Sequence, residues 1–140
     1  MNEDSIIVQL RDKKLLVVNP KRKNGLIIYK RYHAEFAGPG AVVGSFFDLD
    51  VEGVLPVGSL SLITPQTSQE RISAYLLRRQ WVRLIKQITD NPEPIERAET
   101  ILNQFRHWFD EETASQLPDE AFARLVGVLP QTIRRAREIE

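Results

Sequence analysis

The sequence contains no cysteine, and it has no apolar stretch long enough to cross a bilayer. The lack of cysteine excludes disulfide bonds, thiolate zinc sites and cysteine nucleophiles, and it is typical of proteins from a reducing compartment. The acidic start, residues 1–4, is not followed by a long apolar run, so we expect no signal peptide. These absences predict a cytoplasmic protein without a membrane partner.

Histidine is also scarce. His33 and His107 lie far apart, and neither has other potential ligands at metal-binding spacing around it. The run Phe46-Phe47-Asp48-Leu49-Asp50 is similar to the first motif of haloacid-dehalogenase-type phosphotransferases, but Glu52 replaces the expected Thr or Val and no βαβ pattern surrounds it. The two aspartates of this run alternate on a strand, and we expect them to face water. We therefore predict a protein that is not an enzyme and has no catalytic residues, cofactor or metal.

Short runs rich in β-forming residues follow one another in the first half of the chain. They cover residues 5–10, 14–19, 26–32, 41–49, 51–55 and 58–63. The polar residues 11–13 predict a hairpin between the first two runs, Asn24-Gly25 predicts a turn, and residues 38–40 break the chain. Because no helix separates the runs, we expect a small antiparallel meander or partly closed barrel and not a parallel sheet.

Helical signals begin at Thr67, where Thr67-Ser68-Gln69-Glu70 has the form of a capping box. The helix that follows should end near Ile88. Its expected apolar residues are Ile72, Leu76 or Leu77, Trp81, Leu84 and Ile88. A second helix is predicted over residues 94–109, with the stripe Ile95, Ala98, Leu102, Phe105 and Phe109 widened by Ile101 and Trp108.

The last part of the chain predicts two shorter helices. Residues 110–113 are polar and should begin a loop, Pro118 opens a helix that runs through Val126, and Pro130 opens the last helix. The expected core of this part is Trp108, Phe105, Phe122, Leu125 and Ile133. The fold class is therefore α+β, with an antiparallel β module at 1–66, a connecting helix at 67–91 and a tri-helical helix-turn-helix unit at 92–140.

Residues 123–135 have the steric pattern of a helix-turn-helix. Ala123 is small enough to let a second helix cross closely, Gly127 provides the positive φ that ends the first helix, and Ile133 returns to the angle between the helices. Pro130 fits the first turn of the second helix. This run resembles the helix-turn-helix of bacterial transcription regulators, most closely the mercury-resistance-regulator family, and it is also similar to the lactose-repressor family. The resemblance implies sequence-specific binding of double-stranded DNA.

The residues expected to contact DNA lie on two helices. They are Gln131, Thr132, Arg134, Arg135 and Arg137 on the last helix, and Arg79, Arg83 and Lys86 on the long one. On such a helix Gln131 would contact an adenine edge and an arginine a guanine edge, while the other cations would contact phosphates. Self-association as a homodimer is expected, because paired half-sites increase affinity and specificity.

The distribution of charge along the chain also supports an alternative to DNA binding. Residues 67–91 hold five Lys or Arg and two Asp or Glu, a charge of +3, whereas residues 92–140 hold six and ten, a charge of −4. A DNA-binding surface usually has a basic footprint. The acidic balance, and Leu129 where a capping serine is usual, favour a non-enzymatic assembly subunit that uses the tri-helical unit to dock a protein partner.

Two groups of basic residues have both a functional and a purely structural interpretation. Arg78, Arg79, Arg83 and Lys86 form a cluster that would contact phosphates or simply be solvated. A further basic patch, around the turn predicted at Asn24-Gly25, would bind single-stranded nucleic acid or protect a sheet edge. Its members are Lys21, Arg22, Lys23, Lys30 and Arg31, with Tyr29 and Tyr32 between them.

Overall fold

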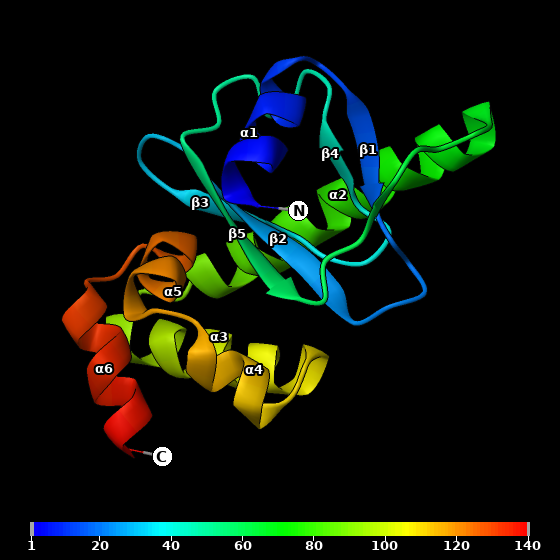
Figure 1. Ribbon diagram of the computed structural model, residues 1–140. Coiled ribbons are helices and arrows are strands. Elements are labelled where there is room, and N and C mark those ends of the chain that lie inside the picture. Colours follow the sequence, from blue (N-terminus) through cyan, green and yellow to red (C-terminus); the bar gives the residue numbers. More distant parts are fainter. Residues whose placement is uncertain (1, 140) are drawn as a thin grey trace.

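The computed structural model describes residues 2–139 and has the expected α+β fold, with two small antiparallel sheets followed by a helical region (Figure 1). The β part contains α1 (Glu3–Arg11), β1 (Leu15–Val18), β2 (Asn24–Tyr29), β3 (Ala34–Ala37), β4 (Val42–Gly44), β5 (Gly53–Gly58) and β6 (Leu62–Ile63). The helical region contains α2 (Ser68–Thr89), α3 (Pro94–Trp108), α4 (Glu111–Gln116), α5 (Asp119–Val126) and α6 (Pro130–Ile139).

Each sheet has three strands, in the orders β4-β1-β6 and β3-β2-β5. In the second sheet Ile27 of β2 lies opposite Phe36 and Leu55. Successive side chains of a strand point to opposite faces, and both faces of β2 are buried. Leu26 and Ile28 join a core with α1, whereas Ile27 joins the core formed with the helical region. The β3-β2-β5 sheet therefore lies between two cores.

The predicted strand at residues 5–10 is wrong, because this segment forms α1. The side-chain oxygen of Asn2 accepts a hydrogen bond from the Ser5 amide at 2.8 Å and caps the helix. Ile6 and Leu10, four residues apart, are fully buried, while Val8 between them is exposed. The apolar residues that look like a strand are thus spaced for one face of a helix, and the hairpin predicted at residues 11–13 does not form.

The turn predicted at Asn24-Gly25 is also wrong. Both residues belong to β2 and are buried, and the turn comes earlier, at residues 20–23. The side-chain amide of Asn24 donates to the Asn19 carbonyl at 3.0 Å and so stabilises that turn from within the strand. A Cβ on Gly25 would lie 2.6 Å from the ring of Phe36, so glycine is needed here for close packing.

The other strands differ mainly in extent. The strand predicted over 41–49 is limited to β4, because residues 45–50 turn and bring Asp48 inside the protein. The runs predicted at 51–55 and 58–63 appear as β5 and β6 with shifted ends. Sequence reasoning missed β3, whose two alanines and one glutamate have low β-propensity. Phe36 in this strand is fully buried and fixes its position.

The long helix α2 is confirmed, together with its cap, since Thr67 Oγ1 accepts a hydrogen bond from the Glu70 amide at 3.1 Å. The predicted apolar face is wrong in part. Ile72 and Leu76 are 54% and 52% exposed, and Leu84 is exposed as well. The buried residues of α2 are Ala74, Arg78 and Ile85. The helix therefore packs against β3 and β4 with a face that contains a charged side chain.

The tri-helical unit has the expected core except that Trp108 is only half-buried. Phe105 of α3, Phe122 of α5 and Ile133 of α6 are fully buried, and Leu125 is nearly so. The loop predicted to begin at residues 110–113 is instead the start of α4, because the Asp110 carboxylate accepts a hydrogen bond from the amide three residues later and caps a helix.

The two parts of the chain share one core. The ring of Phe36 from β3 lies 5.2 Å from that of Trp81 on α2, and 4.9 Å and 5.9 Å from those of Phe105 and Trp108 on α3. Edge-to-face and offset aromatic contacts at these distances are favourable. The helical unit is thereby held directly against the β3-β2-β5 sheet.

Candidate functional site

The turn between α5 and α6 has the geometry that its sequence predicts. Gly127 ends α5 at φ 68° and ψ 43°, the left-handed region that favours glycine. No atom within 4 Å would obstruct a Cβ there, so the backbone conformation, and not space, calls for glycine. The Val128 amide donates to the Ala123 carbonyl at 3.1 Å and closes the turn. Ala123 and Ile133 are buried where the two helices meet.

Arg97 of α3 fixes this turn from outside. Its Nε donates to the Val126 carbonyl at 3.0 Å, and its Nη2 donates to the Gly127 carbonyl at 3.2 Å. Its Nη1 donates to the Asn91 carbonyl at 2.6 Å. Carbonyls at the end of a helix lack partners within the helix, so this arginine satisfies the end of α5. Sequence reasoning missed Arg97, because about thirty positions separate it from the turn and no local pattern links them.

The predicted DNA contacts on α6 divide into an exposed group and a held one. Gln131, Arg134 and Arg135 are exposed, and Thr132 is half-buried. Arg134 Nε lies 3.7 Å from Asp119 Oδ2, too far for a hydrogen bond, and its side chain is 65% exposed. One face of α6 thus presents an amide and two guanidinium groups to solvent.

Arg137 is the held residue of α6. Its Nε donates to Asp119 Oδ1 at 2.8 Å, and its Nη2 donates to the Leu117 carbonyl at 2.6 Å. Its guanidinium lies 5.3 Å from the centre of the Phe122 ring, within the range of a cation–π contact. The structure therefore places Arg137 as a tie between α6 and the start of α5.

The predicted contacts on α2 are exposed. Arg79, Arg83 and Lys86 border a shallow hollow of about 330 Å³. Lys86 also lines a second cavity together with Val128 of the α5–α6 turn. Lys86 and the turn thus border the same cavity, whereas Arg79 and Arg83 do not line it.

The fourth member of the predicted α2 cluster, Arg78, is not a surface residue. Its side chain is 1% exposed. Both terminal nitrogens bond the carboxylate of Asp48, at 2.9 Å and 3.1 Å. They also donate to Glu35 Oε1 at 2.9 Å and to the Val42 carbonyl at 3.0 Å. A paired guanidinium and carboxylate of this kind form strong, directional hydrogen bonds.

Lys30 completes this buried ionic cluster. Its Nζ donates to Asp48 Oδ1 at 3.0 Å, to Asp50 Oδ1 at 2.7 Å and to the Phe47 carbonyl at 2.6 Å. Lys30 is therefore not part of a surface patch. The prediction that both aspartates face water is wrong for Asp48, which is fully buried, while Asp50 is 72% exposed. Asp48 also accepts a hydrogen bond from the Gly44 amide at 2.7 Å.

Charges within the cluster hold its carboxylates in the ionised form. Burial by itself would raise the pKa of Asp48, but the hydrogen bonds and charge of Arg78 and the charge of Lys30 lower it below its usual value. The pKa of Glu35 is lowered in the same way, since Arg78 outweighs the effect of burial. Ionised carboxylates that are each bonded to a cation are suited to joining α2 to the β part, and not to taking up a proton near neutral pH.

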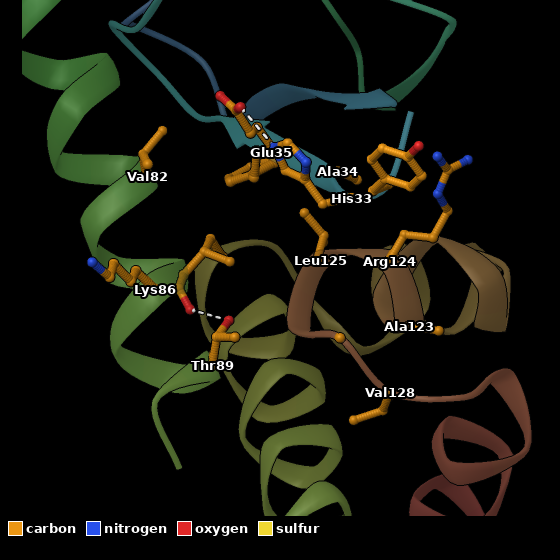
Figure 2. A pocket seen from close by; sticks show the side chains of 14 residues that line it. His33, Ala34, Glu35, Val82, Lys86, Thr89, Ala123, Arg124, Leu125 and Val128 are labelled. Atoms are coloured by element: carbon orange, nitrogen blue, oxygen red, sulfur yellow. Dashed lines mark hydrogen bonds and ion pairs between the residues drawn. The ribbon is translucent and has the colours of Figure 1, made fainter. Parts of the chain in front are cut away.

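A cavity lies where the two halves of the protein meet. It has a volume of about 440 Å³ and is lined by residues of β3, α2, α5 and the α5–α6 turn (Figure 2). Within residues 2–139 no group of three or more histidine, aspartate or glutamate side chains is placed to hold a metal ion. No helix in the described part of the chain is long and apolar enough to span a membrane.

A scan of protein-family models, a search of curated proteins and a search of solved structures each gave no match to the chain. The function is therefore inferred from the geometry of these residues.

Proposed function

We propose that the protein binds double-stranded DNA through α5, the Gly127 turn and α6, with α6 as the recognition helix, and that it acts in transcription control. The observation that carries the proposal is the left-handed Gly127 turn between two closely packed helices, followed by a helix whose free face presents Gln131, Arg134 and Arg135. Helices in this arrangement enter the major groove with residues near their N-terminus against the bases.

Each exposed residue of α6 has a chemical role in this proposal. Gln131 lies in the first turn of α6, and its side-chain amide would bond the N6 and N7 edge of an adenine. One of the adjacent arginines, Arg134 or Arg135, would bond the O6 and N7 edge of a guanine, and the other would contact a phosphate. Lys86, which lines the same cavity as the turn, is suited to a phosphate on the flanking backbone.

The buried contacts of this unit would lower the entropic cost of binding. Arg97 fixes the turn to α3, and Arg137 fixes α6 to the start of α5. A recognition helix that is already held in place loses less conformational freedom when it binds. These two arginines would therefore support DNA binding without touching the DNA.

A homodimer is part of the proposal, because a second recognition helix multiplies affinity and selects the spacing of two half-sites. The exposed side of α2 supplies an apolar surface for pairing of two copies. Ile72 and Leu76 are each more than half exposed on its first turns, which project beyond the sheets in Figure 1.

The test is binding to random-sequence duplex DNA, measured by fluorescence anisotropy over a series of salt concentrations. Affinity should fall steeply as salt rises. The double variant Arg134→Ala/Arg135→Ala should bind about tenfold more weakly, and its salt slope should be smaller by about one for each phosphate that is no longer neutralised. Lys14→Ala/Arg22→Ala removes two exposed charges from the β part and serves as the charge-matched control.

The alternative is docking of a protein partner on the same unit, and a specific observation favours it. Leu129 and Ile139 are 67% and 63% exposed at the two ends of α6, and the acidic pair Asp119 and Glu120 begins α5. Such a mixed surface suits a protein better than a polyanion. No DNA binding at low salt, or equal weakening in the arginine variant and its control, would reject the DNA proposal in favour of this one.

A further inference from the structure

The cavity between β3, α2 and α5 has mainly apolar walls. Its apolar lining consists of Ala34, Phe36, Val82, Ile85, Ala123, Leu125 and Val128. In Figure 2 Leu125 of α5 points up into the space below His33, and Val82 and Lys86 mark the side formed by α2. Ligand pockets commonly have volumes of about 300–1,000 Å³ and apolar walls with a few polar groups. At about 440 Å³ this cavity suits one small molecule.

The charged groups at its edge are mostly basic. Glu35 contributes a carboxylate, but one of its oxygens accepts a hydrogen bond from Arg78 at 2.9 Å and the other lies 3.1 Å from His33 Nε2. Lys86 and Arg124 contribute cations from α2 and α5. At the edge the two cations outnumber the single carboxylate, so the field there favours an anion.

The two cations of the edge differ in how firmly they are held. Arg124 donates to the Lys30 carbonyl, and its guanidinium lies 5.0 Å from the centre of the Tyr29 ring. The side chain of Lys86 makes no hydrogen bond or ion pair with any residue of the described range 2–139. Its long flexible stem lets the ammonium group turn toward the mouth of the cavity without breaking an existing contact.

We propose that this cavity is a binding site for a small organic carboxylate with an apolar body. The body would lie against Leu125 and the other apolar walls, where burial of its surface supplies most of the affinity. The carboxylate would lie at the edge, within reach of the Lys86 ammonium. Neutral apolar compounds would gain only the first contribution, and organic cations would meet Lys86 and Arg124 as like charges.

The experiment uses octanoate and 1-octanol, which share an apolar chain and differ in charge. Each is titrated into the full-length protein labelled with ¹⁵N, and amide shifts in two-dimensional NMR spectra report both affinity and position. Octanoate should bind about fivefold more tightly than octanol, as expected for one partly exposed ion pair. The largest shifts should fall on residues 33–36, 82–89 and 123–128.

Three variants locate the site. Lys86→Met should reduce the preference for octanoate to less than about twofold. Arg83→Met, which removes an exposed cation of α2 that does not line this cavity, should leave the preference unchanged. Leu125→Phe places a larger side chain in the cavity and should weaken the binding of both ligands. Because Leu125 is buried, the same spectra are used to check that this variant is folded. Equal affinity for the two ligands, shifts elsewhere on the protein, or equal effects of the two cation variants would overturn the proposal.

A consequence of the site rests on the proposed DNA binding. The cavity lining includes residues 123–125 at the end of α5 and residues 127–128 of the α5–α6 turn. An occupant would therefore bias the position of α6, and saturating octanoate should change DNA affinity. If octanoate binds in the cavity and DNA affinity stays constant, only this coupling is rejected. If the protein binds no DNA, the NMR titration still decides whether the site exists.

Discussion

The helices α2 and α6 both carry several arginines within a short stretch, and each uses one of them internally. On α2, Arg78 is 1% exposed and is shared by two carboxylates, while its neighbour Arg79 is exposed. On α6, Arg137 is 22% exposed and donates a hydrogen bond to Asp119, while Arg134 and Arg135 are exposed and Arg134 only approaches Asp119 at 3.7 Å. The difference shows that an arginine run alone does not mark a binding surface. What matters is which member is withdrawn from solvent by hydrogen bonds to a carboxylate of a neighbouring element.

The two internal arginines also differ in energetic consequence. The contacts of Arg78 are removed from water, so their loss would leave a charge without compensation in the interior. The contacts of Arg137 are partly solvated, and solvent screens the ion pair with Asp119. The ionic cluster of α2 should therefore dominate the stability of the fold, and the arginines of α6 should dominate binding.

The largest expected effect is that of Asp48→Asn, which keeps the shape of the side chain but removes the charge shared by Arg78 and Lys30. We expect the free energy of unfolding to fall by about 3–5 kcal/mol, since one partner of a buried ion pair is removed. Urea denaturation followed by circular dichroism measures it. The control is Asp50→Asn, whose exposed carboxylate should contribute less than about 1 kcal/mol. Similar losses in both variants would contradict the assignment of Asp48 as the centre of the cluster.

Acid should weaken the same cluster. The pKa values of Asp48 and Glu35 are lowered in the folded protein, so the unfolded chain takes up protons first as the pH falls. Their contribution is complete above the ordinary carboxyl pKa of about 4, and it is lost as the pH falls through the lowered values. The free energy of unfolding should decline from about pH 5 downward. Asp48→Asn should decline less steeply, and an unchanged slope would speak against this explanation.

A smaller effect should separate the arginines of α6. Arg137→Ala removes two hydrogen bonds and a ring contact, and it should lower the free energy of unfolding by about 1–2 kcal/mol. Arg135→Ala should change it by less than about 0.5 kcal/mol, because the side chain is exposed. Under the proposed function the order is reversed for DNA affinity. Equal stability effects would mean that the contacts of Arg137 with Asp119 and Leu117 are not maintained in solution.

The smallest effect concerns the turn itself. Gly127→Ala should cost about 1 kcal/mol, because an L-residue is strained at φ 68° although nothing obstructs its Cβ. Gly127→Asn should cost less, since asparagine tolerates the left-handed region better than alanine. Thermal denaturation of the two variants provides the measurement. An alanine variant as stable as the original protein would show that the turn adopts another conformation in solution.

Predictions from the sequence succeeded where the signal is local. The capping threonine at position 67, Pro130 and Gly127 mark helix ends through backbone rules that involve only neighbouring residues. Predictions failed where two local patterns compete. Residues 5–10 contain enough branched apolar residues for a strand, but the burial of Ile6 and Leu10 against the sheet selects the helix.

The candidate site was predictable only in part, for the same reason. Exposure of Gln131, Arg134 and Arg135 follows from their helical spacing relative to the buried Ile133. The roles of Arg97 and Lys86 do not follow from helical spacing, because these roles depend on how separate helices pack.

The sequence by itself determined the α+β order of the chain, the long helix, and the two helices joined at Gly127, because these follow from propensity, capping and the period of apolar residues. Only the tertiary structure decided which charges are buried. Arg78 and Asp48 are thirty residues apart, and no periodic pattern relates them. Their pairing depends on the turn after β4 and on the face that α2 turns toward the β part, and a buried charge is stable only where such packing supplies its partner.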